Sequence, residues 1–166
     1  MGLLAVYIKV DDQKLTVLKK LEGEDLIEEL EEFQDDDNCK MVDIDKTWDG
    51  LHFLLTNVSA SEPIPNNKLS EFVVGVNVFS EDENADFISY SSANEIKDIL
   101  KEINKVNLSE LEHTFKPNTF DKNGIYPNIW NDNDKELLWD ELKTSFNLLK
   151  EFYTKNKDSN IIVSIY

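Results

Sequence analysis

Arginine is absent from this 166-residue chain, and cysteine, histidine and glycine are scarce. All 17 basic side chains are lysines, so the planar guanidinium that commonly binds phosphate and reads guanine is missing. The 34 acidic side chains bring the formal net charge to −17, which repels nucleic-acid phosphates and anionic lipid surfaces. We therefore expect binding neither to nucleic acid nor to a membrane, and a basic protein partner if the partner is charged.

The scarce residues also remove most recognisable reactive centres. One cysteine, Cys39, forms neither an internal disulfide nor a four-thiolate metal site, and two histidines cannot build a three-histidine site. The five glycines are scattered, so no phosphate-binding loop is present, and no nucleophile-elbow, zinc-protease or Cys-x-x-Cys motif occurs. The acid-rich residues 132–134 lack the glycine and distal glutamate of a calcium loop. We expect no metal and no cofactor.

Long apolar runs are missing as well. No stretch approaches the roughly 18 apolar residues of a membrane span. Residues 1–10 have no basic segment ahead of a long apolar run, so we expect a strand there rather than a signal peptide, and a cytoplasmic protein. The length fits a single domain over residues 1–166, and the 40% hydrophobic content is that of a globular chain.

Hydrophobic periodicity predicts strands separated by helices. Apolar, β-branched runs predict strands over residues 3–10, 71–79, 87–90 and 161–166. Apolar stripes at helical spacing predict helices over residues 13–20, 24–33, 43–56, 93–104, 108–115 and 134–153. The remaining long segments are predicted to be connections or irregular, at residues 59–68, 80–86 and 116–133. This order predicts an α/β or α+β domain, with helices packed on a mixed sheet that contains some parallel neighbours.

Residues 43–56 carry the candidate for acid–base chemistry. On a helical wheel, Asp45, Asp49 and His52 fall within about 60° of one another at the edge of an apolar stripe. A carboxylate beside an imidazole could hold a general base or, with a third group, a metal. A structural histidine bonded to a local carboxylate or carbonyl is the alternative, and both interpretations stay open here.

Aromatic residues supply a second hypothesis, a ligand pocket. Trp48 in the same segment, with Tyr126 and Trp130 in a long proline-containing loop, can form pocket walls beside His52. Alternatively, Trp48 is a core anchor and the loop aromatics pin the loop to the core. A small enzyme or ligand-binding domain around His52, Asp45, Trp48 and Tyr126 is thus one functional hypothesis.

The densest charge lies in residues 22–37, where ten of sixteen residues are acidic and none is lysine. Nine of them make up the predicted partner-binding patch: Glu24, Asp25, Glu28, Glu29, Glu31, Glu32, Asp35, Asp36 and Asp37. This patch favours a non-catalytic binding protein that meets a basic protein, in an immunity or regulator role. A solvated face that only keeps the protein soluble is the plainer interpretation.

The motif Asp-Ile-Asp-Lys-Thr-Trp-Asp-Gly-Leu-His-Phe at residues 43–53 resembles the YfbM-like family of bacterial proteins. The match continues, in the same order along the chain, in Met1-Gly2, Leu69-Ser70 and Ile125-Tyr126-Pro127. The resemblance implies a single domain of three layers, α/β/α, with helices covering a mixed sheet. It implies little about activity, because the family is known as a domain of unknown function. The chain departs from it at residues 90–94, where many relatives carry a Gly-Pro-Ala-Arg-like stretch.

Overall fold

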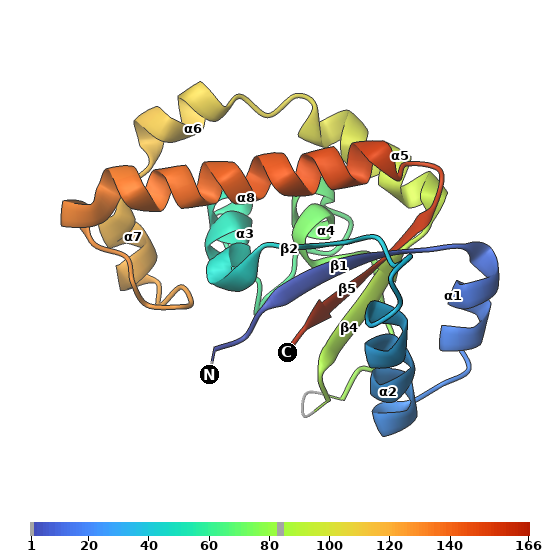
Figure 1. Cartoon of the computed structure of the whole chain (residues 1–166). Coiled ribbons are helices and arrows are strands. Elements are labelled where there is room, and N and C mark those ends of the chain that lie inside the picture. The colour runs from blue at the N-terminus through green and yellow to red at the C-terminus, as the bar shows by residue number, and fades with distance from the viewer. Residues whose placement is uncertain (1, 83–84) are drawn as a thin grey trace.

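The computed structural model describes residues 2–82 and 85–166, and an antiparallel sheet forms its centre (Figure 1). The strands are β1 Ala5–Val10, β2 Met41–Asp43, β3 Asn77–Val78, β4 Phe87–Ser91 and β5 Asn160–Ile165. Their order across the sheet is β2-β1-β5-β4-β3. The strands from the two ends of the chain, β1 and β5, pair along their whole length, from Ala5 opposite Ile165 to Val10 opposite Asn160.

The four strand pairings in the described residues are all antiparallel. The predicted α+β class is confirmed, but the expected mixed sheet with parallel neighbours is wrong. The reason is the position of β5. Strands β1 and β4 run in the same direction, yet β5 lies between them and is antiparallel to both, so the two parallel strands are not neighbours.

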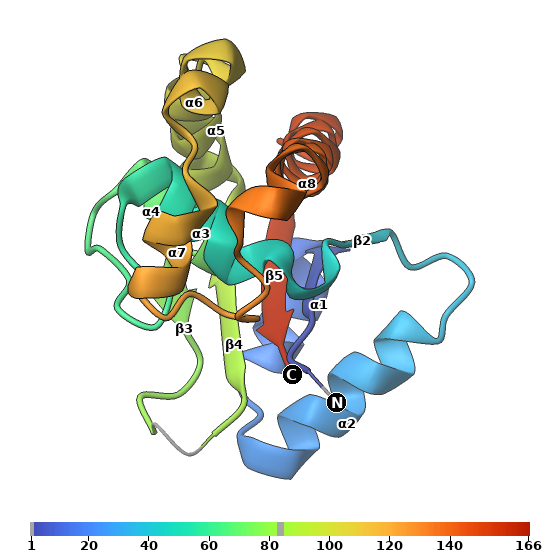
Figure 2. The ribbon, with the colours of Figure 1, turned by 90° about the vertical axis from the view of Figure 1, so that its left-hand side faces the viewer.

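Helices cover both faces of this sheet and give the three layers that the family resemblance implies (Figures 1 and 2). One face is covered by α1 Asp12–Leu18 and α2 Gly23–Gln34. The other is covered by α3 Trp48–Thr56, α4 Lys68–Val74, α5 Ala93–Ile103 and α8 Lys135–Lys155, with α6 Leu108–Thr114 and α7 Pro117–Lys122 packed at the edge of this layer. Because side chains alternate along a strand, Val6 and Ile8 pack under α1 and α2, whereas Ala5 and Tyr7 enter the larger core.

Most predicted helices form close to their predicted limits, because their apolar stripes and caps agree. The side chain of Asp11 accepts a hydrogen bond from Lys14 N at the start of α1. Ser92 and Glu95 form a capping box at the start of α5. Buried stripes then hold each helix against the sheet, as Leu26 and Leu30 do for α2.

The strand predicted over residues 71–79 is wrong. The segment is the end of α4, a turn at Gly75 and the two-residue strand β3. Asn67 Oδ1 caps the helix by accepting from the backbone N–H groups of Leu69 and Ser70 at 3.0 and 3.1 Å. The helix ends where Gly75 adopts φ +75°, close against Ser89. A short run that is apolar on both faces has no period of its own, so packing decided its conformation.

The predicted helix over residues 43–56 begins later than expected. Asp43 belongs to β2, and its Oδ1 accepts from Asp45 N at 2.6 Å. A short 3-10 helix, η1 Asp45–Thr47, precedes α3, and Asp45 has φ 54°. Asp45 therefore does not share a helical face with Asp49 and His52, and the wheel argument fails for it.

One other predicted connection differs from the structure. Residues 116–133 are less irregular than expected, since they contain α7, with Pro117 in its first turn, and the start of the 3-10 helix η2 Asp132–Asp134. Within the predicted connection 80–86, residues 83–84 lie outside the described residues. The strands on its two sides, β3 and β4, are antiparallel neighbours.

Candidate functional site

The imidazole of His52 is fully buried and both ring nitrogens are occupied. Nδ1 lies 2.7 Å from Val58 O, and Nε2 lies 2.7 Å from Ser70 Oγ. Ser70 Oγ also accepts from Ile64 N at 3.0 Å, which leaves its own proton free for Nε2. Because a carbonyl oxygen only accepts, the proton of the neutral ring lies on Nδ1 and is donated to Val58 O, and Nε2 accepts from the Ser70 hydroxyl. Burial lowers the pKa of His52, while the Val58 hydrogen bond and the Asp49 charge oppose that shift.

Asp49 is equally enclosed, with 3% of its surface exposed. Its Oδ1 accepts from Ser59 Oγ at 2.9 Å and from Ala60 N at 2.7 Å. Its Oδ2 accepts from Tyr126 N at 2.8 Å. Because a buried carboxylate needs such donors, Asp49 links α3 to two loops that are far apart in the sequence.

Of the aromatic residues predicted to line a pocket, Trp48 and Tyr126 pack on each other, and Trp130 packs on Phe120. Trp48 stacks on Tyr126 with ring centroids 5.5 Å apart, and its Nε1 donates to Leu3 O at 3.2 Å. Trp130 Nε1 donates to Ile125 O at 2.8 Å. Gly50 makes room for the Trp130 ring, since a Cβ at this position would lie 2.4 Å from it. These contacts fasten the 125–130 loop to α3.

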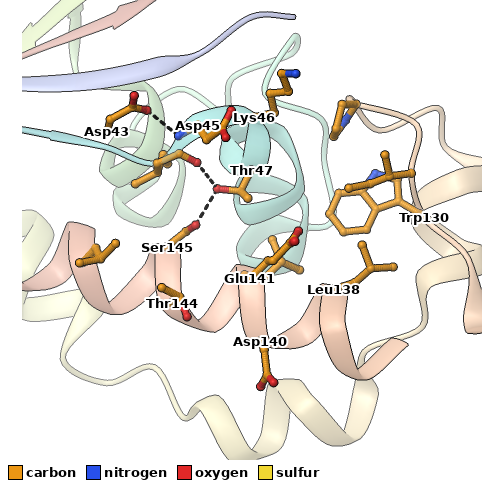
Figure 3. A pocket seen from close by; sticks show the side chains of 15 residues that line it. Asp43, Asp45, Lys46, Thr47, Trp130, Leu138, Asp140, Glu141, Thr144 and Ser145 are labelled. Carbon is orange, nitrogen blue, oxygen red and sulfur yellow. Dashed lines mark hydrogen bonds between the residues drawn. The ribbon is translucent and has the colours of Figure 1, made fainter. Parts of the chain in front are cut away.

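An open hollow lies next to this packed cluster, between η1, the 127–130 loop and α8 (Figure 3). We call it the α8 groove, and its cavity volume is about 690 Å³. It is lined by Asp43, Ile44, Asp45, Lys46, Thr47, Pro127, Ile129, Trp130, Leu138, Asp140, Glu141, Leu142, Thr144, Ser145 and Leu148. Of the predicted site residues, Asp45 and Trp130 line it, whereas His52, Asp49, Trp48 and Tyr126 do not.

The lining of the α8 groove combines acidic residues with an apolar floor, and Asp140 among them points to the side of α8 away from η1 (Figure 3). Asp43, Asp45, Asp140 and Glu141 are exposed, and none of them forms an ion pair within residues 2–82 and 85–166. Lys46 is the one cation among the lining residues. Figure 3 shows Glu141 between α8 and η1, and Lys46 pointing away from α8.

A hydrogen-bonded pair holds the two walls of the groove together. Thr47 Oγ1 lies 2.6 Å from Ile44 O and 2.7 Å from Ser145 Oγ (Figure 3). Since a hydroxyl has a single proton, Thr47 donates to the carbonyl and accepts from Ser145. This contact joins η1 to α8 across nearly a hundred residues of sequence, so the groove is formed by the folded protein without a ligand.

The predicted acidic patch lies on and just beyond α2. Eight of its nine side chains are exposed, while Glu29 is partly buried and forms an ion pair with Lys14. Lys14 Nζ also lies 4.7 Å from the centre of the Phe33 ring. Two hydrogen bonds that Asn38 donates to Asp36 lower the pKa of the Asp36 carboxyl, and the bond from the backbone N–H has a larger effect than the bond from the side chain. The carboxylates face solvent because Leu26 and Leu30 turn the opposite face of the helix to the sheet.

Sequence reasoning did not find the α8 groove. Its walls come from segments that no motif connects, and Asp140 and Glu141 look like ordinary surface acids of an amphipathic helix. The one usable signal is a pair of large apolar residues outside the buried stripes, Ile129 and Leu148, which are 46% and 44% exposed.

Two kinds of feature are absent from residues 2–82 and 85–166. No group of three or more His, Cys, Asp or Glu side chains there is arranged to hold a metal ion. No helix there combines the length and the apolar character that crossing a bilayer requires.

The fold and the groove together define a three-layer α+β protein with an acid-rimmed surface groove and a sealed histidine. Comparison with known proteins agrees with the fold. The chain belongs to the family described as "Domain of unknown function (DUF1877)", which it matches over residues 1–166. The resemblance noted in the sequence is thereby confirmed.

Two comparisons, one of sequence and one of structure, match a protein with the name YfbM. Protein YfbM of Escherichia coli (strain K12) is 27% identical over 129 residues, which cover 78% of this chain and 75% of that protein. The crystal structure described as a protein of unknown function, YfbM from Escherichia coli, is similar with a TM-score of 0.82 over 98% of this chain and 99% of that chain. At 23% identity this likeness shows a shared fold.

Proposed function

We propose that this protein is a non-catalytic binding protein whose acidic exterior meets a basic protein partner. Immunity proteins and regulators of basic proteins are the classes that such a surface suits. We place the protein in the cytoplasm, with neither nucleic acid nor membrane as its target. The acidic patch, defined above by its nine residues on and beyond α2, is the proposed contact surface.

One observation carries the proposal: the acidic patch presents eight exposed carboxylates, and the described residues supply an ion pair only to Glu29. Unpaired surface carboxylates raise the local negative potential and steer a cationic partner towards the helix. The wider charge supports the same conclusion, because acidic side chains outnumber basic ones by 34 to 17 and the net charge is −17.

The alternative, a small enzyme or ligand-binding domain around His52, Asp45, Trp48 and Tyr126, is less well supported. A general base must reach a substrate proton, directly or through one water. His52 has no exposed surface and both its nitrogens are hydrogen-bonded, while Asp45 lies apart from it in the α8 groove.

A pull-down from a lysate of the source cells tests the proposal at about 50 and about 500 mM salt, a range over which screening of exposed charges becomes strong. We expect a basic protein to be retained at low salt and released at high salt. The variant E28Q/E31Q/E32Q on the outer face of α2 should lose it. The matched control E110Q/E112Q/D121N removes the same number of exposed charges from α6 and α7 and should retain it.

The proposal fails if no basic protein is recovered at either salt concentration. It also fails if both triple variants lose the protein equally, since the loss would then follow net charge and not the acidic patch.

A further inference from the structure

We infer that the α8 groove is the seat for a short segment of a partner protein in which lysine or arginine residues flank a large apolar side chain. The inference rests on the proposed function and names a second contact for the same basic partner. It adds what the acidic patch lacks, a cavity that can hold a particular side chain.

Charge complementarity selects the cationic part of the segment. The exposed carboxylates of Asp45 on η1 and Glu141 on α8 belong to the two walls of the groove. Neither forms an ion pair in the described residues, and Lys46 points away from α8. A lysine or arginine placed across the rim can approach Glu141 from one side and Asp45 from the other. An acidic or phosphorylated segment would meet repulsion at the same positions.

The apolar lining selects the other part. Ile44, Leu138 and Leu142 form a buried floor, and the half-exposed Ile129 and Leu148 stand at its edges. An apolar side chain packed against Ile129 or Leu148 would cover surface that is now in contact with water. A purely cationic chain leaves that surface uncovered, so the structure favours a segment that carries both cationic and apolar side chains.

The groove is also suited to a protein segment because it is already formed in the free protein and is open to solvent. The Thr47–Ser145 contact joins its walls, so little has to be ordered when the partner binds. The half-exposed edges leave it open to solvent along its length, which an extended segment can follow. A cavity of about 690 Å³ accommodates a few side chains of such a segment and not a whole domain.

Three synthetic peptides of equal length test the inference with the full chain: lysines around a leucine pair, lysines alone, and the leucine pair with glutamines in place of the lysines. Affinity is measured by fluorescence anisotropy at low salt, and contacts are mapped by changes in amide NMR signals. We expect the mixed peptide to bind most tightly and to shift the signals of Thr47, Trp130 and Ser145.

Two variants with matched controls locate the site. D45N/E141Q should weaken the mixed peptide about three- to tenfold, as loss of two rim charges implies, whereas E110Q/E112Q should not. Leu148→Gln should weaken it similarly, whereas Leu137→Gln should not. Leu137 is also on α8 and is 60% exposed, but it does not line the groove.

The outcomes separate this inference from the proposed function. If the α2 variant loses the cellular partner while both groove variants bind the mixed peptide as the wild type does, the groove inference is overturned and the proposed function stands. If the all-lysine peptide or a small polyamine binds as tightly as the mixed peptide, the apolar floor has no part in binding and the inference also fails. The same holds if no peptide binds.

Discussion

Asp49→Asn should destabilise the protein although it changes few atoms. The carboxylate accepts from Ser59 Oγ and Ala60 N through one oxygen and from Tyr126 N through the other. An asparagine has one carbonyl oxygen, so its NH₂ group must face one of these donors. If the oxygen stays with residues 59 and 60, the N–H of Tyr126 loses its acceptor inside the protein.

The magnitude follows from these contacts. An unsatisfied buried N–H costs about 1–3 kcal/mol, and replacing charge-assisted bonds by neutral ones costs about 1 kcal/mol more. We therefore expect the free energy of unfolding to fall by about 2–4 kcal/mol. With a urea m-value of about 2 kcal/mol/M, the midpoint should shift down by about 1–2 M.

Urea unfolding followed by tryptophan fluorescence measures this change, and Asp45→Asn is the matched control. Asp45 is an exposed carboxylate on the neighbouring 3-10 helix, so the control should stay within about 0.5 kcal/mol of the wild type. If Asp49→Asn also stays within that range at an unchanged m-value, the carboxylate does not hold the two loops, and our account of the segment is refuted.

Three further predictions concern buried polar groups and close packing. Burial lowers the pKa of His52 in the folded state, so the unfolded chain binds more protons near and below pH 6.5. The free energy of unfolding should therefore fall as the pH drops from about 7 to 5. Urea unfolding measured across this pH range should show a smaller decline for His52→Gln, because that variant lacks the contribution of the imidazole. Tyr7→Phe should lower the free energy of unfolding by about 1–2 kcal/mol, because the Tyr7 hydroxyl donates to Val73 O at 2.7 Å. Tyr153→Phe should be neutral or stabilising, because the Tyr153 hydroxyl is buried without a partner among the described residues. Equal losses of stability in thermal unfolding would contradict this. Gly50→Ala should cost about 1–3 kcal/mol and change the tryptophan emission, because the new methyl would meet the Trp130 ring at 2.4 Å; an unchanged melting temperature would show that the loop yields freely.

Local patterns in the sequence were enough for most of the secondary structure. The stripe of α5 and its capping box agree with each other, and the strands at both ends of the chain are β-branched and apolar. The exposure of the acidic patch also follows locally, because an amphipathic helix that buries Leu26 and Leu30 must turn its acids outward.

Tertiary packing decided the segments whose local signals were ambiguous. Residues 71–74 have strand-like composition, yet Phe72 and Val73 are fully buried in a helix that Asn67 caps and Gly75 ends. The relative directions of neighbouring strands could not be predicted either. They depend on the position of β5 between β1 and β4, which brings the two ends of the chain together.

Residue types along the chain thus determined its charge, its missing reactive centres and the outward face of α2, since these depend on composition and on the period of a single helix. Only the three-dimensional structure decided that His52 is sealed, that Asp49 joins two loops and that an open groove lies beside α8. Each of these depends on which distant segments meet: residues 43–47 face residues 138–148 across the groove, and no local period encodes that contact.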